Sequence, residues 1–288
     1  MKDFKIFINL TRLNRPIGYL LLFWPCSWGL AYAYSFNENI EKFLYYLILF
    51  FLGAVLMRSA GCIVNDIVDR KLDKKVNRTR NRPLAADLIS VKNAFLYVII
   101  LCSLAFFILI QFNILTIVLG LASMSLAFSY PFMKRITYWP QLFLGLTFNW
   151  GIIMAWSSVS NYLSIDIFMV YFMAIFWTLG YDTIYGAQDI VDDEIIGVKS
   201  TSIKFKKNPK IFIFSCYFFF YLSLIFVGLL MAFNKFYFIF SLILLLQLFF
   251  FQVYSLTVDN PEDCIKKFKS NNILGFLVFI NILIGKIL

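Results

Sequence analysis

Long apolar runs dominate this chain and restrict its fold more than any other feature. A helix that crosses a bilayer needs about 17 to 25 predominantly apolar residues, and nine runs of that kind follow one another here. We therefore predict an all-α fold, a multi-pass transmembrane helical bundle of nine helices. The predicted spans are residues 17–34, 43–64, 93–112, 114–130, 140–159, 165–184, 211–231, 236–254 and 273–288.

The composition favours one membrane domain over separate soluble units. Of the 288 residues, 61% are hydrophobic and 15% are charged, and no polar block is large enough for a second domain. We predict a single domain over residues 1–288. The connections near Asn113 and Asn234 are very short, so the helices on either side should be antiparallel neighbours. Trp24-Pro25, with no small-residue cleavage site, favours a retained first span over a cleavable signal.

Positive charges gather in alternate connections between the apolar runs. They fall within residues 1–15, 70–82, 134–135, 199–210 and 266–269. The positive-inside rule places these segments and the N-terminus in the cytoplasm, and the C-terminus outside. In so apolar a chain, the net charge of +10 indicates cytoplasmic loops rather than a face that binds nucleic acid.

The chain contains no histidine, which limits the chemistry available to it. Its five cysteines lie apart, mostly in apolar stretches, and form no zinc-binding pattern. Acid, base or metal chemistry therefore falls to carboxylates, Lys, Tyr or Asn. Hard cations that prefer oxygen ligands are the favoured metals.

An acidic motif occurs where the second predicted span reaches the cytoplasm. Asn65, Asp69 and Asp73 are spaced four residues apart, so a continuing helix places them along one face. Two carboxylates at that spacing repel each other unless a cation neutralises them, and Mg²⁺ prefers a few carboxylates together with phosphates and water. The alternative is a solvated helix end with dispersed charge.

A second copy of this pattern follows the sixth predicted span. Tyr185, Asp189 and Asp193 have the same spacing as the first three residues. Both copies follow even-numbered spans, so they emerge on the same membrane face, and the two halves form a parallel repeat. Two facing acidic sites that each hold one Mg²⁺ are suited to clamp a diphosphate.

Basic side chains surround both motifs and suit phosphate oxygens. Most of them are topology signals by default, and Arg70 and Arg135 are the two that we favour as ligands. The full set comprises Arg70, Lys74, the segment that contains Arg78, Arg80 and Arg82, then Lys134, Arg135 and Lys199.

Two charged residues fall deeper in the predicted spans. Arg58 precedes Asn65 by seven residues, and Asp182 precedes Asp189 by the same interval. Charges inside a membrane face the bundle interior and are candidates for function by default. They either line a polar cavity beneath the metals or pair with each other for structure.

Four stretches of this chain closely resemble the UbiA superfamily of intramembrane prenyltransferases, and within it the bacterial 4-hydroxybenzoate polyprenyltransferases of ubiquinone synthesis. These stretches are Arg15-Pro16-Ile17-Gly18 through Trp24-Pro25, Arg58 to Asp66 through Arg82-Pro83-Leu84, Ser129 to Arg135, and Gly180 to Tyr185 through Lys199-Ser200-Thr201. The resemblance implies nine helices and Mg²⁺-dependent condensation. It places the diphosphate-binding motifs on Asn65, Asp69, Asp73, Tyr185, Asp189 and Asp193, and substrate placement on Arg70 and Arg135.

The implied reaction transfers a polyprenyl group from polyprenyl diphosphate to the ring of 4-hydroxybenzoate, in the bacterial inner membrane. Our hypothesis is that Mg²⁺ promotes ionisation of the allylic bond, that Asp189 acts as the base, and that Arg135 or Arg58 holds the substrate carboxylate. Other acceptors known in the superfamily, namely a naphthoate, a haem or a chlorophyll precursor, stay open. A transporter is the alternative from another class, but acids clustered at one surface and a parallel repeat disfavour it.

Overall fold

The computed structural model describes residues 2–35, 40–75 and 79–287, and every regular element in these ranges is helical. The all-α prediction is confirmed. The elements are α1 (Lys2–Thr11), α2 (Ile17–Ala33), α3 (Ile40–Asp73), α4 (Val91–Leu109), α5 (Ile114–Ile136), α6 (Pro140–Ser160), α7 (Ile165–Ala187), α8 (Ile190–Ile196), α9 (Thr201–Lys204), α10 (Pro209–Leu230), α11 (Lys235–Leu245), the π-helix η1 (Leu246–Tyr254) and α12 (Pro261–Ile287).

A helix occupies each predicted span, but the number nine is not confirmed. Within the described ranges, eight helical segments are long and apolar enough to cross a membrane, with α11 and η1 forming one of them. The remaining apolar helix, α2, has 17 residues and contains Pro25.

Two predicted boundaries were wrong because helices outlast their apolar runs. The helix predicted to start at residue 273 begins at Pro261, and the one predicted to end at residue 64 continues to Asp73. Their polar extensions remain helical because buried polar contacts there take the place of apolar packing.

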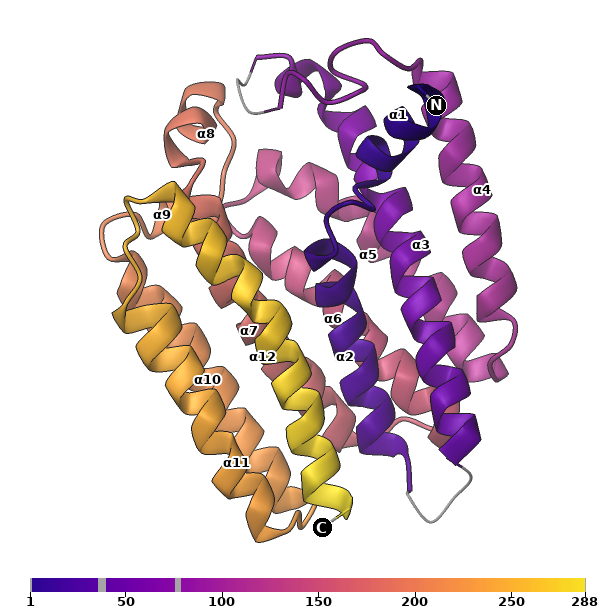
Figure 1. Ribbon diagram of the computed structural model, residues 1–288, viewed down its shortest axis with the longest axis vertical. Coiled ribbons are helices and arrows are strands. Elements are labelled where there is room, and N and C mark those ends of the chain that lie inside the picture. The colour runs from indigo at the N-terminus through magenta and orange to yellow at the C-terminus, as the bar shows by residue number, and fades with distance from the viewer. Residues whose placement is uncertain (1, 36–39, 76–78, 288) are drawn as a thin grey trace.

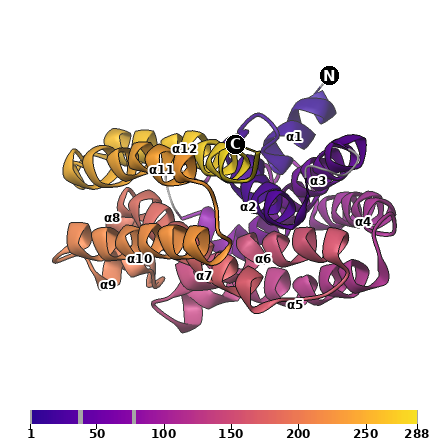
Figure 2. The same cartoon turned by 90° about the horizontal axis from the view of Figure 1, so that it is seen from below.

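The long helices form one bundle with short helices at one end (Figure 1). In the first half, α2 packs against α3 and α6, while α4 packs against α3. In the second half, α7 packs against α10 and α12. Contacts of α6 with α7 and of α2 with α12 join the halves, and Figure 2 shows how the helices stand side by side.

The contact between α2 and α6 depends on two glycines. A Cβ atom on Gly29 would lie 2.3 Å from the carbonyl oxygen of Ile152, and one on Gly151 would lie 2.3 Å from the Sγ atom of Cys26. Small residues let helix backbones approach closely, which is a common basis of packing between membrane helices.

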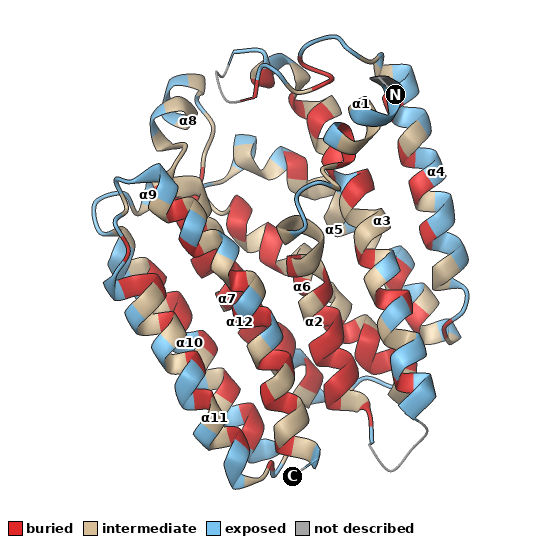
Figure 3. Cartoon of the chain, viewed as in Figure 1, coloured by how far each residue is buried: buried red, intermediate tan, exposed pale blue. Residues whose placement is uncertain are grey.

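The outer surface is apolar where lipid would contact it. Large exposed hydrophobic side chains occur along α4 and α10, such as Phe95, Phe107 and Leu229. Buried residues concentrate toward the bundle interior in Figure 3. Trp28 and Trp177 are both fully buried, and their ring centroids are 4.9 Å apart. Exposed apolar area on this scale is typical of a membrane protein.

A buried polar network joins the helices of the second half. The Nε1 atom of Trp177 donates to Oδ1 of Asn271 at 2.8 Å, and Asn271 exchanges two 3.0 Å hydrogen bonds with Gln252. Gln252 also accepts a 2.8 Å bond from the Tyr217 hydroxyl. Gln252 lies in η1, so the π-helical register presents an amide to this network.

Most of the basic segments meet at one end of the bundle. The backbone N–H of Lys199 donates to the carbonyl oxygen of Lys134 at 2.8 Å, and Lys134 forms an ion pair with Asp69 at the end of α3. The N-terminal segment reaches the same place through Arg12, which contacts Asp66. In Figure 1, α1, α8 and α9 all lie at this end.

Candidate active site

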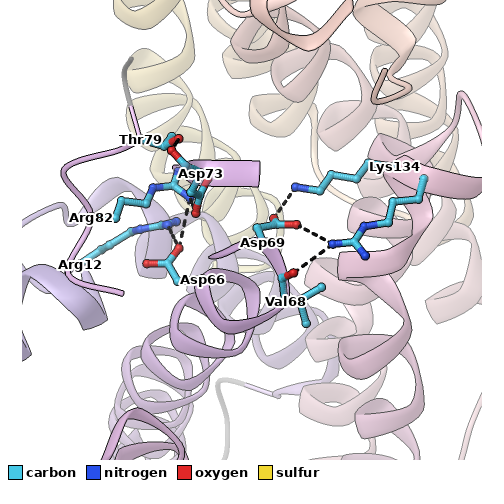
Figure 4. Close-up of polar contacts among 9 residues, drawn as sticks. Arg12, Asp66, Val68, Asp69, Asp73, Thr79, Arg82 and Lys134 are labelled. Atoms are coloured by element: carbon cyan, nitrogen blue, oxygen red, sulfur yellow. Dashed lines mark hydrogen bonds and ion pairs between the residues drawn. The ribbon is translucent and has the colours of Figure 1, made fainter. Parts of the chain in front are cut away.

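Three buried carboxylates line the last turns of α3. Asp66 and Asp69 are each 1% exposed and Asp73 is 7% exposed. A buried carboxylate is costly unless it is paired and hydrogen-bonded, and all three have basic partners (Figure 4). The Thr79 hydroxyl adds a bond to the Asp73 carbonyl oxygen at 3.1 Å, which caps the helix end.

Asp66 and Asp73 share one partner. The Nη1 atom of Arg82 lies 3.2 Å from Oδ1 of Asp66 and 2.9 Å from Oδ2 of Asp73. A second guanidinium, that of Arg12, donates to the same Oδ1 atom of Asp66 at 2.6 Å. The loop after α3 and the segment after α1 are therefore both attached to the acidic helix end.

Asp69 is directed toward α5 instead. Its carboxylate forms an ion pair with Lys134 and lies 3.4 Å from Nη2 of Arg135. Arg135 also donates to the carbonyl oxygen of Val68 at 3.0 Å. The last turn of α5 is thus bound to α3 by two cations on one buried anion.

Both carboxylates of the first motif are paired with basic side chains in this structure. Asp69 and Asp73 bind different cations from different segments. Among the described residues, no group of three or more Asp, Glu, Cys or His side chains is arranged to hold a metal ion. Lys and Arg neutralise these carboxylates here, and a metal ion held by Asn65, Asp69 and Asp73 stays a prediction.

The second motif has the predicted spacing but a different backbone. Tyr185 lies in α7, which ends at Ala187, and Asp189 stands at the N-cap position of the short helix α8, which contains Asp193. The first motif therefore lies on one continuous helix, whereas the second spans the break between α7 and α8. A Cβ on Gly186 would lie 2.5 Å from the Ser202 hydroxyl, so α7 ends where α9 approaches its backbone.

Arg70, which we favoured as a phosphate ligand, is bound to the loop that follows its own helix. Its Nε atom donates to the carbonyl oxygen of Leu84 at 3.1 Å, and its guanidinium forms an ion pair with Asp87. Lys74 lies 2.6 Å from the same carboxylate. Hydrogen bonds from Lys74 and Arg70 lower the pKa of Asp87 below its ordinary value.

Lys199 also makes a local contact. Its ammonium group donates to the carbonyl oxygen of Ile136 at 3.1 Å and lies 5.6 Å from the centre of the Tyr138 ring. Lys199 therefore fastens the loop before α9 to the turn after α5. Arg78, another predicted cation, lies outside the described residues.

A cavity of about 610 Å³ lies next to the acidic helix end and reaches deep into the first half of the bundle. It brings together four of the predicted site residues: Arg58 and Asn65 from α3, and Asp182 and Tyr185 from α7. The deeper walls are mainly apolar. They include Leu49, Phe50, Leu109, Phe112, Leu121 and Met154.

Arg58 and Asp182 both line this cavity, as the first alternative for these residues predicted. The Nε atom of Arg58 is buried and has no hydrogen-bond partner among the described residues. The guanidinium carbon lies 5.4 Å from the centre of the Phe148 ring. A buried donor without a partner, on a wall of a cavity, indicates a site for an anionic or polar ligand group.

The cavity lining also includes Arg82, one of the cations predicted to surround the motifs, and two cations that were not predicted as ligands, Arg12 and Arg15. Asp66, the carboxylate that holds Arg12 and Arg82, was not selected either. A sequence signal was available, because Asp66 and Asp73 are seven residues apart, the same two-turn interval that relates Arg58 to Asn65.

Sequence comparison links the chain to one protein family. Residues 22–282 match the UbiA prenyltransferase family. The chain is 42% identical over 286 residues to the mitochondrial 4-hydroxybenzoate polyprenyltransferase of Bos taurus, covering 98% of this chain and 75% of that one. It is 39% identical over 285 residues to the 4-hydroxybenzoate octaprenyltransferase of Vibrio atlanticus, covering 97% of both chains.

Solved structures share the fold at low sequence identity. A UbiA homologue from Aeropyrum pernix superposes with a TM-score of 0.76 at 19% identity, over 93% of this chain and 97% of that one. A homologue from Archaeoglobus fulgidus, solved with GPP and Mg²⁺ bound, gives a TM-score of 0.71 at 17% identity, over 98% of this chain and 100% of that one.

Proposed function

We propose, because the chain belongs to the UbiA prenyltransferase family, that it transfers a polyprenyl group from polyprenyl diphosphate to the ring of 4-hydroxybenzoate. The allylic carbon–oxygen bond breaks, and diphosphate leaves with the bonding electrons. A carbon–carbon bond forms ortho to the phenol oxygen, and the ring carbon then loses its proton. This reaction fits the ubiquinone pathway that the sequence resemblance suggested.

The cavity is the observation that carries this proposal. It joins a polar end, with Arg12, Asn65, Arg82 and Tyr185, to a long apolar interior. A polyprenyl diphosphate has the same division between an anionic head and an apolar tail. The head suits the arginine-lined end, because one guanidinium group can donate two parallel hydrogen bonds to phosphate oxygens. The tail suits the walls around Phe50 and Phe112.

The oxygen-rich donors at the two motifs fit Mg²⁺ in chemical type. The residues that would hold it are Asn65, Asp69, Asp73, Asp189 and Asp193, all of them oxygen donors in a chain without histidine. Bound there, Mg²⁺ would neutralise negative charge on the diphosphate and assist departure of the leaving group. The Archaeoglobus fulgidus homologue, solved with GPP and Mg²⁺ bound, supports the use of this metal in the family.

The basic partners of the carboxylates have a second use in this scheme. Lys134, Arg135 and Arg82 neutralise buried acids. Ammonium and guanidinium groups placed there are suited to donate to phosphate oxygens when substrate binds. These cations would then donate to phosphate oxygens from positions that they already occupy. Little rearrangement of the protein would be needed during the reaction.

Arg58 is the better candidate to hold the acceptor carboxylate. Arg135 is bound to Val68 and Asp69 and is not part of the cavity lining, whereas Arg58 is part of it and has a buried Nε–H without a described partner. A benzoate carboxylate would satisfy this donor and place its ring in the cavity, whose lining includes Phe148.

The proton acceptor, like the residue that holds the acceptor carboxylate, is chosen from the residues that line the cavity. Asp182 lines the cavity together with Arg58, whereas Asp189 is not part of the described lining. We therefore prefer Asp182 to Asp189 as the group that accepts the proton released during ring substitution. We assign Asp189 to the diphosphate site, among the residues that would hold Mg²⁺.

The reaction belongs at a membrane surface. The bundle is a membrane protein, and we propose that its basic end, which carries both motifs, faces the cytoplasm of a bacterium with the protein in the inner membrane. The Vibrio relative supports a bacterial setting, and the animal relatives are named as mitochondrial.

A product assay in isolated membranes tests the proposal. Membranes that contain the protein are incubated with 4-hydroxybenzoate or dihydroxynaphthoate and with prenyl diphosphates of different chain length, and products are identified by mass spectrometry. A prenylated 4-hydroxybenzoate is expected, together with released diphosphate. Exclusive prenylation of the naphthoate would reject the acceptor but keep the reaction class, and membranes without the protein provide the background.

A further inference from the structure

Asp66 is a buried carboxylate that has no part in the reaction proposed above. It follows Asn65 directly and is 1% exposed. Both cations bound to it, Arg12 at 2.6 Å and Arg82 at 3.2 Å, contact the same oxygen atom, Oδ1. Because both guanidinium groups bind one carboxylate oxygen, Asp66 holds two positive charges close together.

Both guanidinium groups belong to the cavity wall. Arg12 and Arg82 are in its lining, and their side chains are 21% and 23% exposed. Each guanidinium carries five N–H donors. In the part of the chain that the structure describes, Arg12 uses Nη2 and Arg82 uses Nη1 for the carboxylates. The other donors remain for a ligand in the cavity.

The backbone at Arg12 is held in an uncommon conformation. Its φ of +57° is in the left-handed region, which non-glycine residues seldom adopt without a compensating constraint. The constraint comes from α1, because Leu10 is 0% exposed and packs in a core cluster with Ala60 and Ile63 of α3. The chain then turns sharply, with the N–H of Arg15 donating to the carbonyl oxygen of Arg12 at 2.9 Å.

We propose that Arg12 is a diphosphate-binding residue contributed by the N-terminal segment, and that Asp66 is a positioning residue that holds Arg12 and Arg82 toward the cavity. The identity of the ligand rests on the proposed function. A free arginine side chain loses much conformational entropy when it binds a phosphate, and an anchored one has lost it already. Asp66 therefore increases affinity for the anionic head without touching it.

The test measures binding of inorganic diphosphate to the full-length purified protein in detergent with Mg²⁺, by calorimetry. Arg12→Asn removes the charge and keeps a residue that tolerates a left-handed backbone. Arg12→Asn and Asp66→Asn should each weaken diphosphate binding about tenfold or more, as expected for loss of a charged hydrogen bond. Arg12→Lys keeps the ion pair and should show a smaller loss.

Kinetics separate positioning from a structural role. Both Asn variants should raise KM for the prenyl diphosphate and leave KM for 4-hydroxybenzoate nearly unchanged. The double variant should lose less than the product of the two single losses, because Asp66 acts through Arg12. Two matched controls, Lys5→Asn on the exposed side of α1 and Asp166→Asn at the start of α7, should bind diphosphate like the wild type.

Normal diphosphate affinity in Arg12→Asn would overturn the inference. So would an Asp66→Asn protein that is less stable and binds diphosphate normally, because that result assigns Asp66 to folding alone. If Asp66→Asn does not fold, the two Arg12 variants decide. The binding measurement needs no acceptor, so loss of binding in the variants sustains the inference even if the wild type fails to prenylate 4-hydroxybenzoate.

Discussion

The carboxylate of Asp69, near the end of α3, forms an ion pair with Lys134 in the last turn of α5. The carboxylate is 1% exposed and the Lys134 side chain is 29% exposed, so a buried anion meets a partly accessible cation. Any divalent cation or diphosphate that binds the acidic helix end must compete with Lys134 or recruit it. This pair therefore connects the packing of two helices to the chemistry of the site.

Asp69→Asn and Asp193→Asn test the two acidic motifs. Each change removes one negative charge and keeps the shape of the side chain. Prenyl transfer should fall by about 100-fold or more, the scale seen when one electrostatic group is removed from an active site. Product is measured in membranes and normalised to inserted protein, with Asp166→Asn as the matched acid control. Near-normal turnover in either variant contradicts a role in prenyl transfer for the motif that contains the substituted residue.

Removal of the metal tests the Mg²⁺ assignment. Exhaustive treatment of the membranes with EDTA should stop product formation, because Asp and Asn oxygens without the cation repel the diphosphate rather than bind it. Addition of excess Mg²⁺ should restore it. Product formation that survives chelation would require a mechanism that depends on the Lys and Arg residues alone.

Arg58→Leu tests the acceptor site. Loss of a buried charged donor should raise KM for 4-hydroxybenzoate by about 10-fold to 100-fold, which corresponds to about 1.5–3 kcal/mol. KM for the prenyl diphosphate should change much less. Arg58→Lys keeps the charge but loses the planar donor pair, so it should fall between Arg58→Leu and the wild type. A larger rise in KM for the prenyl diphosphate than in KM for 4-hydroxybenzoate would place Arg58 in the diphosphate site.

Gly29→Ala tests the close contact of α2 with α6. The added methyl group meets the Ile152 carbonyl oxygen at 2.3 Å, so the helices must separate, and a stability loss of about 1–3 kcal/mol is expected for such overpacking. Gly53→Ala in α3 is the matched control, because its Cβ meets nothing within 4 Å. Thermal unfolding in detergent should show a lower Tm for Gly29→Ala alone.

The contribution to stability from the ion pairs of Asp87 with Lys74 and Arg70 should depend on pH. These cations lower the pKa of Asp87 in the folded protein, so the ionised form is stabilised relative to the unfolded chain, whose carboxyl pKa is about 3.9. The contribution is present above that value and is lost as pH falls through the lower folded pKa. The Tm difference between wild type and Asp87→Asn should therefore be constant near neutrality and shrink in acid. A difference independent of pH would contradict this pairing.

Sequence alone located the helices and predicted four residues that line the cavity, namely Arg58, Asn65, Asp182 and Tyr185. Apolar length predicts a membrane helix because the bilayer thickness sets the number of residues needed. Helical periodicity relates Arg58 to Asn65 because both lie on one helix. The same reasoning could not foresee that Arg70 binds Asp87 or that α7 ends before Asp189. Those outcomes depend on a loop and on α9, which local patterns do not place.

By itself the sequence determined that this chain is a helical membrane protein with two acidic motifs, since apolar length and helical spacing are local properties. Only the tertiary structure decided which cation each buried carboxylate meets. Asp69 pairs with Lys134, 65 residues away, and Asp66 pairs with Arg12, 54 residues away. Such pairs form when packed helices bring distant segments together and when burial makes an unpaired charge too costly.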